Sequence, residues 1–213
     1  MAHIILLGDS IFDNLKYVQP EPDVSVQLQE ILPAGWKVSL LAVDGAVTND
    51  VSGQLSNLPD DATHLVLSVG GNDLLGCTGD LLQKPVAVSS EVFLMLARVI
   101  DVFESMYRRA VEACLTKGLP LVVCTIYNGN FADQEFQTMA RVAVALFNDA
   151  ILRLSREKSL PSVDLRLVCA SAEDYANPIE PSAIGGKKIA REIWRTISSG
   201  GHPTIPPLRE VIR

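Results

Sequence analysis

The sequence predicts an α/β fold in which a parallel β-sheet carries helices on both of its faces. The first observation is residues 4–7, four consecutive apolar residues that run directly into Gly8, Asp9 and Ser10. A short, unbroken apolar run suits a strand buried on both faces, as in a parallel sheet. The second is that four further strand-like segments alternate with helix-like segments, a pattern typical of βαβ units. With 48% hydrophobic and 20% charged residues, the chain can bury the core that such a sheet needs.

Local signals mark where the predicted elements begin and end. Asp23 and Ser90 are side chains that can cap the first free backbone amides of a helix. Gly118 follows the longest predicted helix, as expected just beyond a helix C terminus. Residues 74–90 contain glycine and proline and are expected to form a surface excursion. The predicted strands are 4–7, 36–43, 63–69, 119–126 and 163–168, and the predicted helices are 23–32, 48–58, 91–117, 133–158 and 182–198.

The length of 213 residues predicts a single domain over residues 1–198, followed by an irregular, proline-containing tail at 199–213. The four cysteines, Cys77, Cys114, Cys124 and Cys169, are far apart in the sequence. This spacing favours buried thiols in a reducing compartment over a metal site or a disulfide framework.

Charge and hydropathy exclude several classes of partner. The formal net charge of −7 disfavours a nucleic-acid binder, which needs a basic surface for the phosphates. No apolar run reaches the roughly 18 residues of a membrane span. No leader pattern of a basic segment, an apolar segment and a cleavage site precedes the first strand, so the expected location is the cytoplasm.

Glycine-bearing turns follow the first three predicted strands, at Gly8, Gly45 and Gly71. Right-handed crossovers bring the C-terminal ends of parallel strands to one edge, where α/β sheets bind ligands. Ser10 could supply a hydroxyl nucleophile there. The backbone amides of Ser10 and Gly45 and the side-chain amide of Asn72 could form an oxyanion hole. The alternative is that Ser10 and Asn72 are ordinary loop or capping residues.

An ordered set of four short blocks resembles the SGNH, or GDSL, hydrolases. The blocks span residues 4 to about 195, nearly the whole chain, and are Gly8-Asp9-Ser10-Ile11, Gly45, Gly71-Asn72-Asp73 and Pro181-Ser182-Ala183-Ile184-Gly185. The resemblance implies a three-layer flavodoxin-like sandwich with a five-stranded parallel sheet of order 2-1-3-4-5. It also implies an esterase-type mechanism with Ser10 as nucleophile and with Ser10, Gly45 and Asn72 as oxyanion donors.

The last block departs from the family pattern. The family reads Asp-x-x-His-Pro-Ser, whereas residues 177–182 read Asn-Pro-Ile-Glu-Pro-Ser. Glu180 therefore stands at the position of the base histidine, and Asn177 at the position of its orienting aspartate. A second register places Asp174 at the aspartate and Asn177 at the histidine. We prefer the first register because the following Pro, Ser and Gly then match, and neither register supplies a histidine.

None of the histidines is expected to replace the missing one. His3 and His64 precede the first and third predicted strands, which places them at the sheet edge opposite Ser10. His202 follows the last predicted helix, which should run away from the sheet edge that carries Ser10.

Two functional hypotheses follow. In the first, the protein is a serine-dependent hydrolase of a small acyl ester, without a cofactor, and Glu180 is the general base. Burial would raise its pKa from about 4.3, and Asn177 would donate a hydrogen bond that orients it. In the second, the site has lost hydrolysis and binds an ester, acyl or sugar ligand. Glu180 would then be a carboxylate favoured by the dipole of the helix that follows it.

Further side chains are expected near the crevice. Asp9, Asp13 and Asp73 could shape substrate choice or raise the Glu180 pKa by repulsion, but they lack the ligand spacing of a divalent-metal site. Residues 74–90 and 127–132 are expected to line the pocket, with apolar contacts from Leu75, Tyr127 and Phe131. The sequence leaves acyl esters, acetylated sugars and thioesters open as substrates, and also the oligomeric state.

Overall fold

A five-stranded parallel β-sheet forms the centre of the protein, whose computed structural model describes residues 2–200. The strand order is β2-β1-β3-β4-β5, as predicted. β1 pairs in parallel with β2 on one side and with β3 on the other, so the C-terminal ends of the strands meet at one edge. The strands are β1 (Ala2–Gly8), β2 (Trp36–Leu40), β3 (His64–Ser68), β4 (Leu121–Cys124) and β5 (Ser162–Val163).

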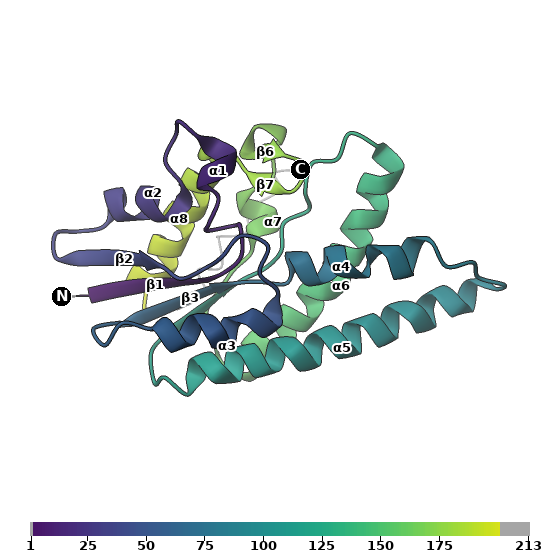
Figure 1. Cartoon of the computed structure of the whole chain (residues 1–213), viewed down its shortest axis with the longest axis horizontal. Coiled ribbons are helices and arrows are strands. Elements are labelled where there is room, and N and C mark those ends of the chain that lie inside the picture. Colours follow the sequence, from purple (N-terminus) through teal and green to yellow (C-terminus); the bar gives the residue numbers. More distant parts are fainter. Residues whose placement is uncertain (1, 201–213) are drawn as a thin grey trace, which may run out of the picture.

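Helices cover both faces of the sheet and produce a three-layer, flavodoxin-like arrangement (Figure 1). One face carries α2 (Val24–Ile31) and α8 (Ala183–Ser198), and the other carries α3 (Val51–Gln54), α5 (Ser89–Leu115) and α6 (Gln134–Glu157). Three of these helices begin at side-chain caps: Asp23, Asp133 and Ser182 accept the backbone amides of Val26, Phe136 and Gly185. The remaining elements are α1 (Leu15–Val18), α4 (Gly71–Leu82), α7 (Leu165–Val168), β6 (Tyr175–Asn177), β7 (Glu180–Pro181) and 3₁₀ turns at Thr48–Asp50, Leu55–Asn57 and Ala172–Asp174.

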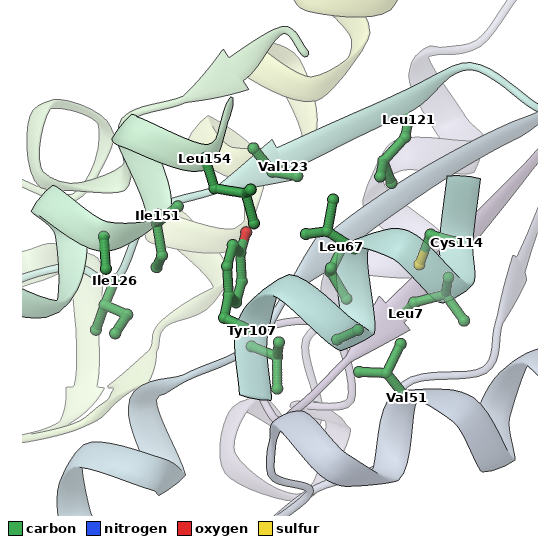
Figure 2. Close-up of a cluster of buried hydrophobic side chains, with 14 of the residues drawn as sticks. Leu7, Val51, Leu67, Tyr107, Cys114, Leu121, Val123, Ile126, Ile151 and Leu154 are labelled. Carbon is green, nitrogen blue, oxygen red and sulfur yellow. The ribbon is translucent and has the colours of Figure 1, made fainter. Parts of the chain in front are cut away.

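The core consists of two apolar layers, one on each face of the sheet. Along β1, Ile4 and Leu6 point into the layer under α2 and α8, whereas Ile5 and Leu7 point into the layer under α5 and α6. All four side chains are fully buried, which explains why the strand reads as an unbroken apolar run. Figure 2 shows the second layer, where the Tyr107 ring of α5 lies close to Ile151 and Leu154 of α6.

The structure corrects two of the predicted elements. Residues 71–82 form helix α4, whereas the sequence predicted a surface excursion from residue 74; the glycines in this segment are tolerated inside the helix. The fifth strand is short, and the predicted strand residues 165–168 form α7 instead, because the Asp164 side chain accepts the Arg166 amide and caps a helical turn.

Other predictions differ in detail. Val92 belongs to the apolar stripe that recurs at helical spacing in α5, which favours a core-facing position, but it is exposed because the first turns of α5 extend beyond the sheet (Figure 1). Val142 of α6 is likewise exposed. Cys114, Cys124 and Cys169 are buried as expected, whereas Cys77 is only partly buried. Within residues 2–200, every helix is too short or too polar for a bilayer span. The tail predicted at 199–213 lies, from residue 201 onward, outside the described residues.

Candidate active site

Ser10 lies in the tight turn that leaves β1. Gly8, the last residue of the strand, has a φ of +126°, and a Cβ there would lie 1.7 Å from the Ser68 carbonyl oxygen. The Gln54 side chain holds both polar groups of Gly8, since its Oε1 accepts the Gly8 amide at 2.8 Å and its Nε2 donates to the Gly8 carbonyl at 2.7 Å. The Asp9 amide donates to the Ser68 carbonyl at 3.1 Å. The exit of β1 is therefore rigidly held, and only glycine fits at its end.

Glu180 reaches Ser10 from the far end of the chain. It begins β7, in the two-stranded hairpin with β6 that lies beyond the C-terminal ends of the sheet strands (Figure 1). The Ser10 Oγ donates a hydrogen bond of 3.0 Å to Glu180 Oε1. Both side chains are buried, with Ser10 7% and Glu180 4% exposed. This is the geometry in which a carboxylate can take a proton from a hydroxyl.

Two anchors hold the hairpin against the sheet edge. Asn14 Nδ2 donates to the Pro181 carbonyl at 3.2 Å, and the Tyr127 hydroxyl donates to the Ile179 carbonyl at 2.5 Å. These bonds fix the backbone on either side of Glu180. The carboxylate is thus positioned by residues from the β1 and β4 exits.

The surroundings of Glu180 favour its neutral form. The pKa of its carboxyl is raised to about 7. Burial is the largest cause and repulsion from Asp44 acts in the same direction, whereas the hydrogen bond from Ser10 and the charge of Lys16 act against them. Its second oxygen, Oε2, is buried and has no hydrogen-bond partner among residues 2–200. A carboxylate with this pKa is a far better proton acceptor near neutral pH than an ordinary glutamate.

Of the expected oxyanion donors, Asn72 lies in the groove with Ser10, whereas Gly45 lies outside it. Asn72, in the first turn of α4, lines the same groove as Ser10, and its Nδ2 donates to the Ala46 carbonyl at 2.9 Å. Gly45 has a φ of +82° and directly precedes Ala46. It lines an adjacent hollow beside β2 instead of the Ser10 groove. The hydrogen bond from Asn72 nevertheless holds the Gly45 loop against α4.

Asn177 acts on the hairpin backbone. Its Oδ1 accepts the amides of Ile179 and Glu180, at 2.9 and 3.0 Å, in an Asx turn. The expectation that Asn177 donates to the Glu180 carboxylate is therefore not met in the structure, and its side chain instead shapes the turn that presents Glu180. Asp174, the aspartate of the second register, is fully buried, pairs with Lys188 at 2.6 Å and is not among the groove residues.

The two described histidines lie far from Ser10. The His3 ring, near the start of β1, is buried between Asp61 Oδ1 and Ser39 Oγ, each at 2.8 Å. The His64 ring, at the start of β3, packs against Trp36 in a tilted arrangement with ring centroids 5.3 Å apart. Both lie at the sheet edge opposite Ser10, as predicted. His202 falls outside the described residues.

The three aspartates expected near the crevice have different partners. Asp13 Oδ2 accepts the Asp44 amide at 2.9 Å. Asp73 Oδ2 accepts the amide and the hydroxyl of Thr48 at 3.0 and 2.8 Å. Both aspartates therefore hold the segment that follows β2. Asp9 lines the groove, and burial raises its pKa to about 7, with a smaller contribution from repulsion by Glu180. The sequence suggested that these aspartates repel Glu180. Asp9 does so, because the repulsion between these two buried carboxyls is mutual, and Asp44 also raises the Glu180 pKa.

A groove of about 880 Å³, part of it open to solvent, extends from Ser10 and Glu180 between α4, α6 and the loop after β4. Leu75, Tyr127 and Phe131 line it, as the sequence predicted. The part of the chain that the structure describes has no group of three or more His, Cys, Asp or Glu side chains able to hold a metal ion.

Comparison with known proteins decides the family. The sequence profile of the GDSL-like lipase/acylhydrolase family matches residues 6–187, which include both Ser10 and Glu180. The chain belongs to this family. No curated protein sequence matches it.

Solved structures of GDSL-type and related enzymes share the fold. The extracellular lipase of Streptomyces rimosus superposes with a TM-score of 0.66 at 15% identity, over 92% of this chain and 99% of that one. The phospholipase A1 of Streptomyces albidoflavus NA297 gives 0.66 at 14% identity, over 91% and 98%. A catalytic mutant of an acetylxylan esterase from Geobacillus stearothermophilus gives 0.58 at 19% identity, over 92% and 94%.

The sequence analysis of this GDSL-like chain placed residues 74–90 at the groove, but it did not predict that residues 71–82 form its wall as a helix. Leu74, Leu75, Thr78, Leu81 and Leu82 recur at helical spacing, which is the signal of a helix face. The glycines between them favour a loop on local preference, although isolated glycines cost a helix only about 1 kcal/mol each. Asn14 and Gln54 were also missed, since polar side chains that bond to distant backbone groups have no sequence signature.

Proposed function

We propose that the protein is a serine-dependent carboxylic ester hydrolase in which Glu180 acts as the general base. The observation that carries this proposal is the 3.0 Å hydrogen bond from Ser10 Oγ to Glu180 Oε1 at the head of a groove. Membership of the GDSL-like lipase/acylhydrolase family and the lipase and esterase relatives of the same fold support it.

The proposed reaction has two halves. In the first, Ser10 Oγ attacks the acyl carbonyl carbon while its proton passes to Glu180. The tetrahedral intermediate collapses, the alcohol leaves with the proton that Glu180 held, and the acyl group remains on Ser10. In the second half, Glu180 takes a proton from water, the hydroxide attacks the acyl-enzyme, and Glu180 returns the proton to Ser10 Oγ as the carboxylic acid departs.

The negative charge that forms on the carbonyl oxygen needs donors. The Ser10 backbone amide and the Asn72 side-chain amide are the proposed donors from within the groove, with the Gly45 amide as a third at the adjoining loop. Asn177 is proposed as a positioning residue, because it holds the Glu180 amide and not the carboxylate.

The proposal is tested by Ser10-dependent turnover of p-nitrophenyl butyrate. Ser10→Ala and Glu180→Gln should each remove most of kcat/KM, and the double variant should be little worse than either, as expected for groups that act as a unit. Ser56→Ala and Glu173→Gln, at exposed positions, are the matched controls and should retain full activity. Turnover that is absent, or independent of Ser10, contradicts the proposal and favours a ligand-binding protein with a degenerate site.

A further inference from the structure

We infer that the groove beside Ser10 binds the linear alkyl chain of a medium-length acyl group, so that the substrates are esters of about ten-carbon acids and not acetylated sugars. This inference rests on the proposed function, because it assigns the acyl side of the same site. It is carried by the two helix faces that form the groove and by the position of the polar groups at one end.

The walls of the groove are two facing apolar stripes. On α4, the lining residues recur every three or four positions, which places them on one helix face; they are Leu74, Leu75, Thr78, Leu81 and Leu82. On α6, the same spacing appears in Phe136, Met139, Ala140, Ala143 and Val144. The small side chains of Ala140 and Ala143 leave the space between the two helices open.

Several apolar side chains that line the groove are more exposed than the side chains of a closed core. Leu75 is 38%, Leu82 47% and Met139 46% exposed, although all three belong to the groove lining. An alkyl chain lying between the two stripes would remove this apolar surface from water, which is favourable because apolar surface is poorly solvated. The wall is thus built to be covered by an apolar ligand.

Polar groups cluster at the reacting end. Asp9, Ser10, Asn72 and Glu180 line the groove where it meets the sheet edge. Farther along α4, the Thr78 hydroxyl is already used, since it donates to the Leu75 carbonyl at 2.6 Å. A sugar ring needs several donors and acceptors around it, whereas these helix faces offer aliphatic and aromatic carbon.

The length of the α4 wall sets the length of the chain. From Asn72 to Leu82 the helix rises about 15 Å at 1.5 Å per residue. An extended alkyl chain with bonds of about 1.5 Å advances about 1.25 Å per carbon, so the wall accommodates about ten to twelve carbons. Acetyl or butyryl groups would leave most of the groove unfilled.

The first test is the dependence of kcat/KM on chain length. We expect p-nitrophenyl decanoate to exceed p-nitrophenyl acetate by at least about tenfold for the wild type, since each buried methylene adds favourable transfer free energy. Ala140→Trp, which fills the groove from α6, should reduce the decanoate-to-acetate ratio by about tenfold. Ala145→Trp, at an exposed position of the same helix, is the matched control and should keep the wild-type ratio.

The second test separates binding from chemistry. Decan-1-ol, a neutral probe with the proposed chain, should bind the Ser10→Ala variant in isothermal titration calorimetry, and ethanol should not; Ala140→Trp should weaken the binding of decan-1-ol. If no ester is turned over but decan-1-ol binds in this way, the groove assignment holds and the hydrolase proposal fails.

The opposite result overturns the inference alone. If Ser10-dependent turnover is highest for acetate and decan-1-ol does not bind, the hydrolase proposal stands and the alkyl-chain assignment is wrong. The wild-type profile decides this even where Ala140→Trp lowers stability.

Discussion

The Ser10 hydroxyl donates a hydrogen bond to Glu180 Oε1 at 3.0 Å, although the two residues are 170 positions apart in the chain. The partner of the candidate nucleophile is thus a carboxylate whose pKa burial raises to about 7. This one contact links the fold, which brings the first strand exit to the last hairpin, with the chemistry proposed for the site. It also makes the site sensitive to pH in a direction that can be stated.

Activity should rise with pH and then level off. Glu180 must be ionised to accept the Ser10 proton, so kcat/KM should increase through a pKa near 7 and stay constant above it. The measurement is kcat/KM for p-nitrophenyl butyrate from about pH 5 to 9, corrected for spontaneous hydrolysis. A rate that falls as pH rises through 7 would show that the protonated carboxyl is the active form.

Because of Glu180, the free energy of unfolding should fall as pH rises, whereas activity should increase. Its pKa is raised from 4.5 to about 7 on folding, so the folded state holds a proton that the unfolded state has released between these pH values. The free energy of unfolding therefore falls as pH rises from about 4.5 to 7, by at most about 3 kcal/mol for this group.

Glu180→Gln should remove the loss of stability that ionisation of Glu180 causes as pH rises. The variant should melt at a higher temperature than wild type near pH 8, with little difference near pH 4. Glu173→Gln, at an exposed position, is the control and should follow the wild type at both pH values. An equal melting temperature of Glu180→Gln and wild type near pH 8 contradicts the buried carboxylate.

Two tyrosines form a matched pair for stability. The Tyr107 hydroxyl is buried among apolar side chains of the core (Figure 2) and has no hydrogen-bond partner among the described residues. The Tyr175 hydroxyl donates to the Cys169 carbonyl at 2.8 Å. Tyr107→Phe should therefore stabilise the protein by about 1 kcal/mol, and Tyr175→Phe should destabilise it by a similar amount. Chemical denaturation of both variants checks this, and destabilisation by Tyr107→Phe would be the contrary result.

Two glycines test how the Glu180 hairpin is held. A Cβ at Gly185, in the first turn of α8, would lie 2.2 Å from the Asp174 carbonyl oxygen, whereas a Cβ at Gly53 in α3 meets nothing within 4 Å. Gly185→Ala should cost about 2 kcal/mol or more in stability and should also lower kcat, because the Asp174 backbone that must shift precedes the hairpin. Gly53→Ala should be neutral or stabilising by up to about 1 kcal/mol. Equal effects of the two substitutions would contradict the close packing of α8 on this backbone.

Restoring the residues of the family pattern tests the role of position 180. Glu180→His alone should support little turnover, because Asn177 cannot stabilise an imidazolium as an aspartate does. Glu180→His combined with Asn177→Asp should exceed the single variant in kcat/KM on p-nitrophenyl butyrate. If the double variant is no better, the two positions do not act together in the way the family pattern suggests.

The sequence by itself determined the sheet and much of the site's location. Residues 4–7 read as a doubly buried strand because every side chain there is apolar, and Gly8 reads as its end because a glycine followed by Asp and Ser marks a tight turn. Strand order followed from the ordered family blocks. These signals are local, or depend only on the order of the motifs along the chain, so they can be recognised from the sequence alone.

Only the tertiary structure decided which groups meet. The contact between Ser10 and Glu180, the use of Asn177 on the hairpin backbone and the raised Glu180 pKa all depend on burial and on distances between remote segments. The helical form of residues 71–82 could not be predicted because their glycines weaken the local helix signal, whereas packing against α5 and α6 stabilises the helix. Local preferences amount to fractions of a kcal/mol per residue, whereas burial of a large apolar side chain contributes about 1.5–3 kcal/mol, and so tertiary contacts override them.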